Sequence, residues 1–218
     1  MRTPPPRFIV LEGLDGAGTT TQAGRLHHWL TSRGAASFAT REPTTGPVGA
    51  LIRELLAGPS DPTAGGDPPP AGHGERAMAL LFAADRAAHS VEIARRLAAG
   101  AHVICDRYVF SSLAYQTLDA AITPEWVAEA NSGCAVPDIT FLLEVPATLC
   151  LERIAARNDG RTIYERRDLL EAIAEGYARL RAFYAERFGE LVTIDGTRSP
   201  EDVQTAIRDT LRDRFDIR

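Results

Sequence analysis

The sequence feature that most constrains the fold is a glycine-rich segment near the start of the chain. Residues 13–21 read GLDGAGTTT, after the apolar run Phe8–Leu11 and before a helical pattern over residues 22–30. A strand, a glycine turn and a helix start in this order are typical of a phosphate-binding loop. In such a loop, consecutive backbone N–H groups and the helix dipole surround an anion. The segment therefore predicts an α/β unit that binds a phosphorylated ligand.

The loop lacks the lysine that its pattern requires. G-x-x-x-x-G-K-[ST] is satisfied by Gly13, Gly18 and Thr20, but Thr19 stands at the lysine position, and all 24 basic residues of the chain are arginines. The backbone donors survive this change, whereas a cation supplied to phosphoryl transfer is worth about 4–7 kcal/mol. Two interpretations stay open. Either an arginine elsewhere supplies the charge, or the chain is a catalytically impaired nucleotide binder that acts as a sensor or partner subunit.

The composition excludes several classes of protein. The 218 residues, 44% of them hydrophobic, suffice for one α/β domain with a full core. A net charge of −5 argues against non-specific nucleic-acid binding. Cys105, Cys134 and Cys150 lie far apart in apolar surroundings, which predicts buried free thiols in a reducing compartment. Because apolar stretches stay shorter than a membrane span of about 18 residues, we expect a cytoplasmic protein without membrane or nucleic-acid partners.

Short β-type runs alternate with longer helical patterns along the chain. This alternation predicts a five-stranded parallel sheet with helices on both faces and ligands at the carboxyl ends of the strands. We expect one domain over residues 8–214, after a flexible N-terminal segment of residues 1–7. The strand candidates are Phe8–Leu11, Ser37–Thr40, His102–Cys105, Ile139–Val145 and Leu191–Ile194. The helix candidates are residues 20–33, 47–57, 74–99, 111–133, 146–157, 168–188 and 200–214.

Two segments interrupt the alternation. Residues 58–74, GPSDPTAGGDPPPAGHG, are too rich in proline and glycine for a helix or a strand, and predict a mobile surface loop. Residues 158–167, NDGRTIYERR, are polar and dense in arginine, and lie between two helical patterns. This second segment is either a solvated connector or a lid that folds over a nucleotide bound at the strand ends.

Charged residues gather where two of the expected strands end. Asp106 and Arg107 directly follow one strand, and Arg41-Glu42-Pro43 closes another. A carboxylate in such a place can reach Mg²⁺, and an arginine can bind a phosphate through two nitrogens. The alternative is an ordinary surface ion pair. Because these residues share a sheet edge with the phosphate loop, we favour the binding interpretation.

Five segments, in order, resemble those of thymidylate kinases. They are FIVLEGLDGAG, TREPTTGPVGALIREL, ALLFAADRAAH, DRYVFSSLAYQ and PDITFLLEVPATLCLERIAAR. The resemblance extends from Phe8 to about Thr210 and implies a P-loop NTPase fold with a short arginine-rich lid at residues 158–167. It also implies phosphorylation of dTMP to dTDP with ATP and Mg²⁺ in dTTP synthesis, carried out by a homodimer.

The same resemblance implies which residues form the site. The ATP phosphates would be held by Gly13, Leu14, Asp15, Gly16, Ala17, Gly18, Thr19, Thr20 and Thr21. The dTMP site would consist of Asp15, Arg41, Glu42, Pro43, Arg53, Phe82, Arg86, Arg107, Ser111, Tyr115 and Gln116. The catalytic residues would be Asp15, Asp106, Arg107, Arg161 and Arg166. Mg²⁺ would be bound by Thr20 and Asp106, directly or through water, and Arg153 would pack against the adenine.

Several of these residues also have plain structural interpretations. The resemblance implies that Phe82 stacks on thymine, that Arg86 donates to the carbonyl edge of the base, and that Tyr115 favours deoxyribose. From periodicity alone, Phe82 and Tyr115 would be core aromatics and Arg86 would form a surface ion pair. The arginines in or beside the lid, Arg157, Arg161, Arg166 and Arg167, are the candidates for the charge that is missing from the loop, and Arg161 and Arg166 are expected to be catalytic.

Overall fold

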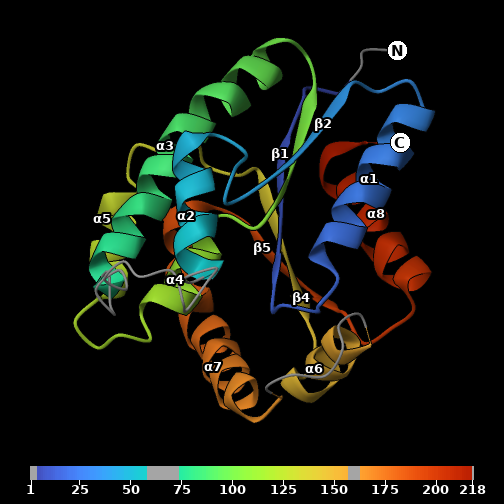
Figure 1. Ribbon diagram of the computed structural model, residues 1–218. Helices are drawn as coiled ribbons and strands as arrows, with labels where there is room; N and C mark the ends of the chain where they lie inside the picture. The colour runs from blue at the N-terminus through green and yellow to red at the C-terminus, as the bar shows by residue number, and fades with distance from the viewer. Residues whose placement is uncertain (1–3, 58–73, 157–162, 218) are drawn as a thin grey trace.

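The structure is a computed structural model that describes residues 4–57, 74–156 and 163–217, with side chains of the last range described from residue 167 on. Figure 1 shows a twisted sheet between two layers of helices. The strands are β1 (Phe8–Gly13), β2 (Ser37–Arg41), β3 (His102–Asp106), β4 (Ile139–Glu144) and β5 (Leu191–Asp195). The helices are α1 (Thr19–Ser32), α2 (Pro47–Ala57), α3 (Glu75–Ala98), α4 (Val109–Gln116), α5 (Pro124–Ala130), α6 (Ala147–Ala155), α7 (Ile163–Phe188) and α8 (Pro200–Phe215).

The sheet confirms the predicted fold class. Its five strands are all parallel and lie in the order β2-β3-β1-β4-β5. Helices α1 and α8 cover one face, and α3, α4 and α7 cover the other (Figure 1). Strands β1 and β3 are buried at every position because they lie inside the sheet and have helices on both faces.

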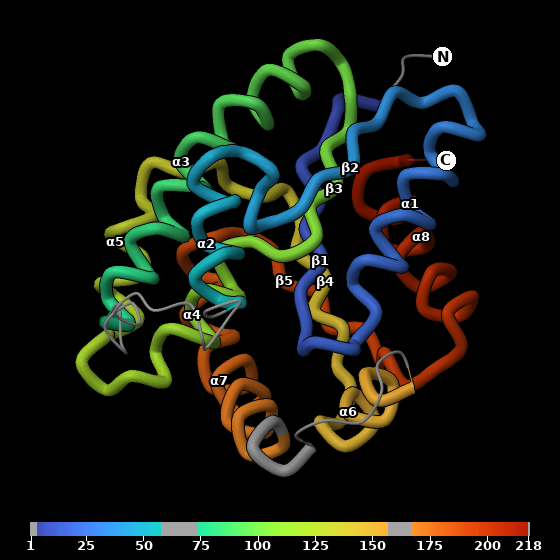
Figure 2. The backbone as a smooth tube through the Cα atoms, in the orientation of Figure 1, coloured from blue at the N-terminus to red at the C-terminus, as the bar shows by residue number. Residues whose placement is uncertain are grey.

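The strand register brings the predicted site segments to one edge. Leu11 of β1 pairs with Asp106 of β3, and Arg41 of β2 pairs with the same Asp106. All of these strands end at the same edge because they are parallel. Figure 2 shows the loop after β1 turning into α1 beside α6, which follows β4. The fold therefore gathers the phosphate loop and the ends of β2 and β3 in one place.

The predicted helix over residues 111–133 is wrong, because the structure contains two helices there. Helix α4 ends at Gln116, and α5 begins at Pro124. Proline fits the first turn of a helix but cannot donate a hydrogen bond in its interior. The Thr123 hydroxyl caps α5 by accepting a hydrogen bond from the backbone N–H of Trp126 at 3.2 Å. Proline and its cap residue thus start a new helix where the apolar spacing suggested a continuous one.

The arginine-rich segment is also shorter than predicted. Helix α7 begins at Ile163 rather than near residue 168, so residues 163–167 belong to its first turns. The preceding residues 157–162, with Arg161, lie outside the described ranges, as do residues 58–73 of the predicted Pro/Gly loop.

At the N-terminal end, Arg7 donates to Asp138 at 2.7 Å. None of the helices within the described ranges has the length and apolar character needed to span a membrane.

Candidate active site

The phosphate loop has the backbone geometry that its glycines predict. Gly16 and Gly18 have φ values of 86° and 101°, in the left-handed region that favours glycine. A Cβ atom at Gly16 would lie 2.6 Å from the carbonyl oxygen of Cys150 on α6, so the loop also packs too closely for a side chain. Gly18, the N-cap residue of α1, has no side chain that could accept hydrogen bonds from the first N–H groups of the helix. The first N–H groups of α1 are therefore free to bind an anion.

Thr19 is the first residue of α1, and it is 5% exposed. Two arginines among the described side chains contact the loop around it. Arg153 lies 3.5 Å from the carbonyl oxygens of both Gly16 and Ala17, and it donates to the Gly196 carbonyl at 3.1 Å. Arg107 forms an ion pair with Asp15 at 2.7 Å. Arg153, which is predicted to pack against the adenine, thus joins the loop to the turn after β5.

Asp106 and Thr20, the two residues predicted to bind Mg²⁺, are hydrogen-bonded to each other. Asp106 is 6% exposed at the end of β3, and its Oδ2 atom accepts a hydrogen bond from the Thr20 hydroxyl. Its Oδ1 atom is buried and has no hydrogen-bond partner among the described residues. A buried carboxylate oxygen without a partner is costly. A hydroxyl and a carboxylate beside a phosphate loop are ligands that suit Mg²⁺, so these residues fit the ion.

Arg107 is held in an unusual conformation between two oxygen acceptors. Its φ of 70° is in the left-handed region, which costs a non-glycine residue about 1–2 kcal/mol. Its guanidinium donates to Asp15 at 2.7 Å and to the Ser111 hydroxyl at 3.1 Å. The ring of Tyr115 lies 5.6 Å from this guanidinium. The charge of Arg107 is therefore directed along the edge that carries the phosphate loop.

Two residues that are predicted to contact the base and the sugar carry buried polar atoms. The Tyr115 hydroxyl and the Gln116 Oε1 atom are buried and have no partner in the described part of the chain. Burial raises the pKa of Tyr115 to about 12, so its hydroxyl stays protonated at neutral pH. Both side chains come from α4, directly after Arg107.

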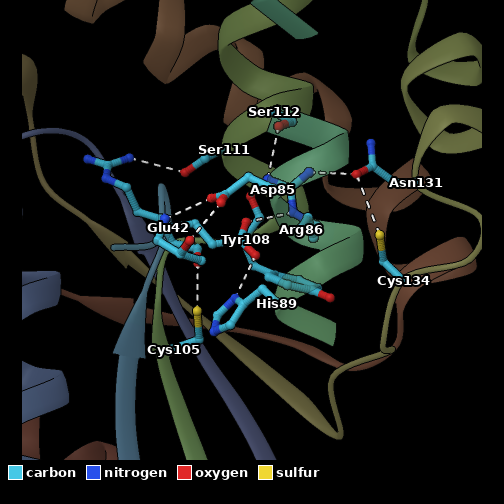
Figure 3. Close-up of polar contacts among 12 residues, drawn as sticks. Glu42, Asp85, Arg86, His89, Cys105, Tyr108, Ser111, Ser112, Asn131 and Cys134 are labelled. Carbon is cyan, nitrogen blue, oxygen red and sulfur yellow. Dashed lines mark hydrogen bonds and ion pairs between the residues drawn. The ribbon is translucent and has the colours of Figure 1, made fainter. Parts of the chain in front are cut away.

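Arg86 lies in a second polar cluster, with Glu42, Tyr108, Ser112 and Asn131 around it (Figure 3). It is 1% exposed, and its Nε atom donates to Glu42 at 2.7 Å. Its other nitrogens donate to Asn131 Oδ1, the Tyr108 carbonyl and the Ser112 hydroxyl. Its charge keeps the buried Glu42 paired, as burial requires. The guanidinium is therefore largely engaged by the protein itself, and it has not formed the surface ion pair that periodicity suggested.

The remaining predicted residues surround these clusters. Arg53, exposed on α2, donates to the carbonyl oxygen of Pro43 at 3.1 Å. Arg41 is exposed at the end of β2, and Phe82 is half-buried on α3. Arg166 lies in the first turn of α7, and its side chain is outside the described part of the structure. The structure thus brings the loop and the Asp106-Arg107 segment together, while Arg41, next to Asp106 in the strand register, and Arg53 are exposed.

Comparisons with known proteins agree with this geometry. A family model described as thymidylate kinase matches residues 11–207. The chain belongs to the thymidylate kinase family. It is 41% identical over 200 residues to a probable thymidylate kinase of Thermococcus kodakarensis, with 91% of this chain and 92% of that protein covered. It is 36% identical to a thymidylate kinase of Desulfovibrio desulfuricans, with 94% of each chain covered.

Glu12, a buried residue beside the phosphate loop of this thymidylate kinase family member, was not predicted from the sequence. It is 0% exposed at the end of β1, directly before the phosphate loop. Burial raises the pKa of its carboxyl group, while hydrogen bonds from Ser111 and the charge of Arg107 oppose this rise. The available signal was a lone carboxylate at the end of a fully apolar strand, a position that charged residues seldom occupy without partners.

His89, Asn131 and Tyr177 were missed for a different reason. His89 bonds Glu42 at 2.9 Å through Nδ1 and Thr40 at 2.9 Å through Nε2. Glu42 lies 47 residues from His89, Arg86 lies 45 residues from Asn131, and Glu12 lies 165 residues from Tyr177, so no local pattern marks these contacts.

A cavity of about 580 Å³ lies on the α7 side of the loop. Its lining includes Gly13, Leu14, Tyr177 and Arg181, but none of the dTMP residues predicted for a thymidylate kinase. This cavity therefore does not coincide with the predicted dTMP residues.

Proposed function

We propose that the chain transfers the γ-phosphoryl group of ATP to dTMP with a phosphate loop whose missing lysine is replaced by arginine from outside the loop. As a member of the thymidylate kinase family, it is an ATP-dependent dTMP kinase. The observation that carries the proposal is the Asp15–Arg107 pair at 2.7 Å, which joins the phosphate loop to the end of β3. Donor and acceptor phosphates meet at this point in the proposed complex.

The acceptor binds between the loop and helices α3 and α4. Arg107 and Arg53 hold the dTMP phosphate, and Asp15 accepts a hydrogen bond from the 3′-hydroxyl group. Phe82 stacks on thymine, while Gln116 and the remaining N–H capacity of Arg86 read the base. Tyr115 crowds the 2′ position. The unpartnered hydroxyl of Tyr115 and Oε1 of Gln116 support this assignment, because a bound nucleotide would supply the partners that they lack.

Thr20 and Asp106 would hold Mg²⁺, directly or through water. The ion would neutralise charge on the ATP phosphates. The buried, unpartnered Oδ1 atom of Asp106 supports this part of the proposal.

The charge that lysine would deliver comes from the lid in this proposal. Arg161 and Arg166 are the candidates, because the neighbouring Arg167 is paired with Glu171 at 2.8 Å on the surface of α7. Arginine stays charged at any working pH and can bind two phosphate oxygens at once.

We also propose a homodimer in a reducing, cytoplasmic compartment. Leu80 and Val91 expose apolar surface on α3, because the two residues are 51% and 72% exposed. The free thiols of Cys105, Cys134 and Cys150 support a reducing environment. Sedimentation velocity tests the dimer, and a monomer at micromolar concentration would contradict it.

The enzymatic proposal is tested by incubating the protein with ATP, Mg²⁺ and dTMP and separating the nucleotides. We expect dTDP and ADP in equal amounts, and higher kcat/KM for dTMP than for dUMP, dCMP or UMP. Binding of dTMP without turnover would contradict the proposal and identify an impaired nucleotide binder.

A further inference from the structure

The carboxylate of Glu12 connects three segments around the phosphate loop. Its Oε1 atom accepts hydrogen bonds from the backbone N–H groups of Tyr108 at 2.8 Å and Ser111 at 3.0 Å. Its Oε2 atom accepts from the Ser111 hydroxyl at 2.6 Å and from the Tyr177 hydroxyl at 3.0 Å. Four donors satisfy a carboxylate that is fully buried. The side chain thus ties β1 to the segment after β3 and to helix α7.

These contacts surround Arg107 on both its backbone and its side chain. The Leu11 carbonyl accepts from the Arg107 N–H at 2.8 Å, and Glu12 accepts from the next N–H along the chain, that of Tyr108. Two consecutive residues of β1 therefore hold the left-handed turn at Arg107. The Ser111 hydroxyl accepts from the Arg107 guanidinium at 3.1 Å and donates to Glu12. Glu12 consequently constrains where the charge of Arg107 can lie.

Tyr177 brings helix α7 into this arrangement. Its hydroxyl also lies 3.0 Å from the Ser111 hydroxyl and 3.4 Å from the carbonyl oxygen of Gly13, the first residue of the loop. Helix α7 starts at Ile163, so it carries the chain from the proposed lid to the loop. The Tyr177 hydroxyl thus contacts both the phosphate loop, at Gly13, and the Ser111 hydroxyl that accepts from Arg107.

From this geometry we infer that Glu12 and Tyr177 are positioning residues that orient Arg107 toward the acceptor phosphate. The inference rests on the proposed role of Arg107 in binding dTMP. Neither residue contacts the acceptor in this assignment. Both act through Ser111 and the Arg107 backbone. Through Tyr177, the binding of dTMP by Arg107 depends on the position of α7.

The experiment compares Tyr177→Phe with Tyr184→Phe as a matched control. Both tyrosines lie on α7, and both rings pack on Phe110, at centroid distances of 4.9 and 4.4 Å. Both hydroxyls are buried and hydrogen-bonded, but Tyr184 bonds Thr140 in the core at 2.8 Å. Each variant therefore removes one buried hydroxyl and keeps the ring.

We expect both variants to lower the melting temperature by a similar few degrees, as the loss of one hydrogen bond does. Only Tyr177→Phe should raise the KM for dTMP, by about tenfold, with the KM for ATP unchanged. Equal dTMP kinetics in the two variants would overturn the inference.

Arg107→Ala, alone and combined with Tyr177→Phe, separates this inference from the proposed function. A positioning role predicts that Tyr177→Phe has no further effect on dTMP binding once Arg107 is removed. If Arg107→Ala weakens dTMP binding strongly and Tyr177→Phe adds its full effect on top, the inference fails while the role of Arg107 stands. If Arg107→Ala leaves dTMP binding unchanged, the proposed role of Arg107 fails, and the inference fails with it.

Discussion

At the scale of single residues, Thr19 stands where a phosphate loop usually has lysine. Such a loop usually combines anion binding by its backbone with a positive charge, and here the two are separated. The left-handed Gly16 and Gly18 and the free start of α1 keep the anion-binding backbone intact. The cation is absent from the loop, and the two arginines that contact it among the described side chains also bond protein groups. Arg107 bonds Asp15, and Arg153 bonds backbone carbonyl groups. We propose that the missing charge arrives from the lid rather than from the loop.

A double-mutant cycle between Thr19 and Arg166 tests whether the lid supplies the charge that the loop lacks. We expect Arg166→Ala to lower kcat by about 10²- to 10³-fold with little change in the KM for dTMP. In a Thr19→Lys background, the same change should cost about tenfold or less, because the new lysine supplies the charge. Steady-state kinetics of the four proteins measure the coupling.

Arg167→Ala is the control for that cycle, because the Arg167 guanidinium is paired with Glu171 on the surface. It should leave kcat within about twofold, as the loss of an exposed ion pair usually does. Independent effects of Thr19→Lys and Arg166→Ala would show that Arg166 does not replace the lysine.

At the scale of elements, the phosphate loop depends on its contact with α6. Gly16 has a left-handed φ and lies so close to the Cys150 carbonyl that a Cβ atom would approach to 2.6 Å. Gly100 also has a left-handed φ, 84°, but a Cβ atom there meets nothing within 4 Å. The two glycines therefore share the backbone strain that alanine would introduce and differ only in the steric contact.

Alanine substitution at these two glycines should separate strain from collision. We expect Gly100→Ala to lower the free energy of unfolding by about 1 kcal/mol and to leave the KM for ATP unchanged. Gly16→Ala should cost at least about 2 kcal/mol more and raise the KM for ATP, since the loop must move away from α6. Urea unfolding and initial rates measure both effects. Equal stability losses with unchanged ATP kinetics would argue against a tightly packed loop.

At the scale of the whole molecule, buried weak acids make stability sensitive to alkaline pH. Burial raises the pKa of Cys150 to about 11 and that of Tyr115 to about 12. In the unfolded chain these groups ionise near 9 and 10. Above pH 9 the unfolded chain therefore binds fewer protons than the native protein, and stability falls as pH rises. The stabilising contribution of Cys150 is fully present below pH 9 and is lost on the way to pH 11.

This loss should be measurable as a fall in unfolding free energy between pH 8.5 and 10.5. Cys150 contributes up to about 1.4 kcal/mol for each pH unit in this window. A Cys150→Ala variant should show a shallower decline from a lower starting stability, because it lacks the titrating thiol. Parallel pH profiles for the two proteins would contradict the role assigned to this thiol.

Much of the molecule is determined by sequence patterns that act over short distances. The alternating apolar runs predict all five strands of the sheet, and the GLDGAG segment predicts the anion-binding loop, because backbone conformation and helix starts depend on neighbouring residues. Even the break between α4 and α5 is marked locally, by the proline and threonine that start α5. The sequence also shows directly that the loop holds threonine instead of lysine.

Only the tertiary structure decides which side chains support the site. Glu12 accepts hydrogen bonds from the Tyr108 N–H, 96 residues away in the sequence, and from the Tyr177 hydroxyl, 165 residues away. Contacts over such separations produce no periodic pattern in the local sequence. Arg86 is engaged inside the protein because Ser112 of α4 and Asn131, directly after α5, accept its hydrogen bonds, although its own helix pattern also allows a surface position. The missing lysine is visible in nine residues of sequence. The arrangement that holds Arg107 beside the loop exists only where strands β1 and β3 and helix α7 meet.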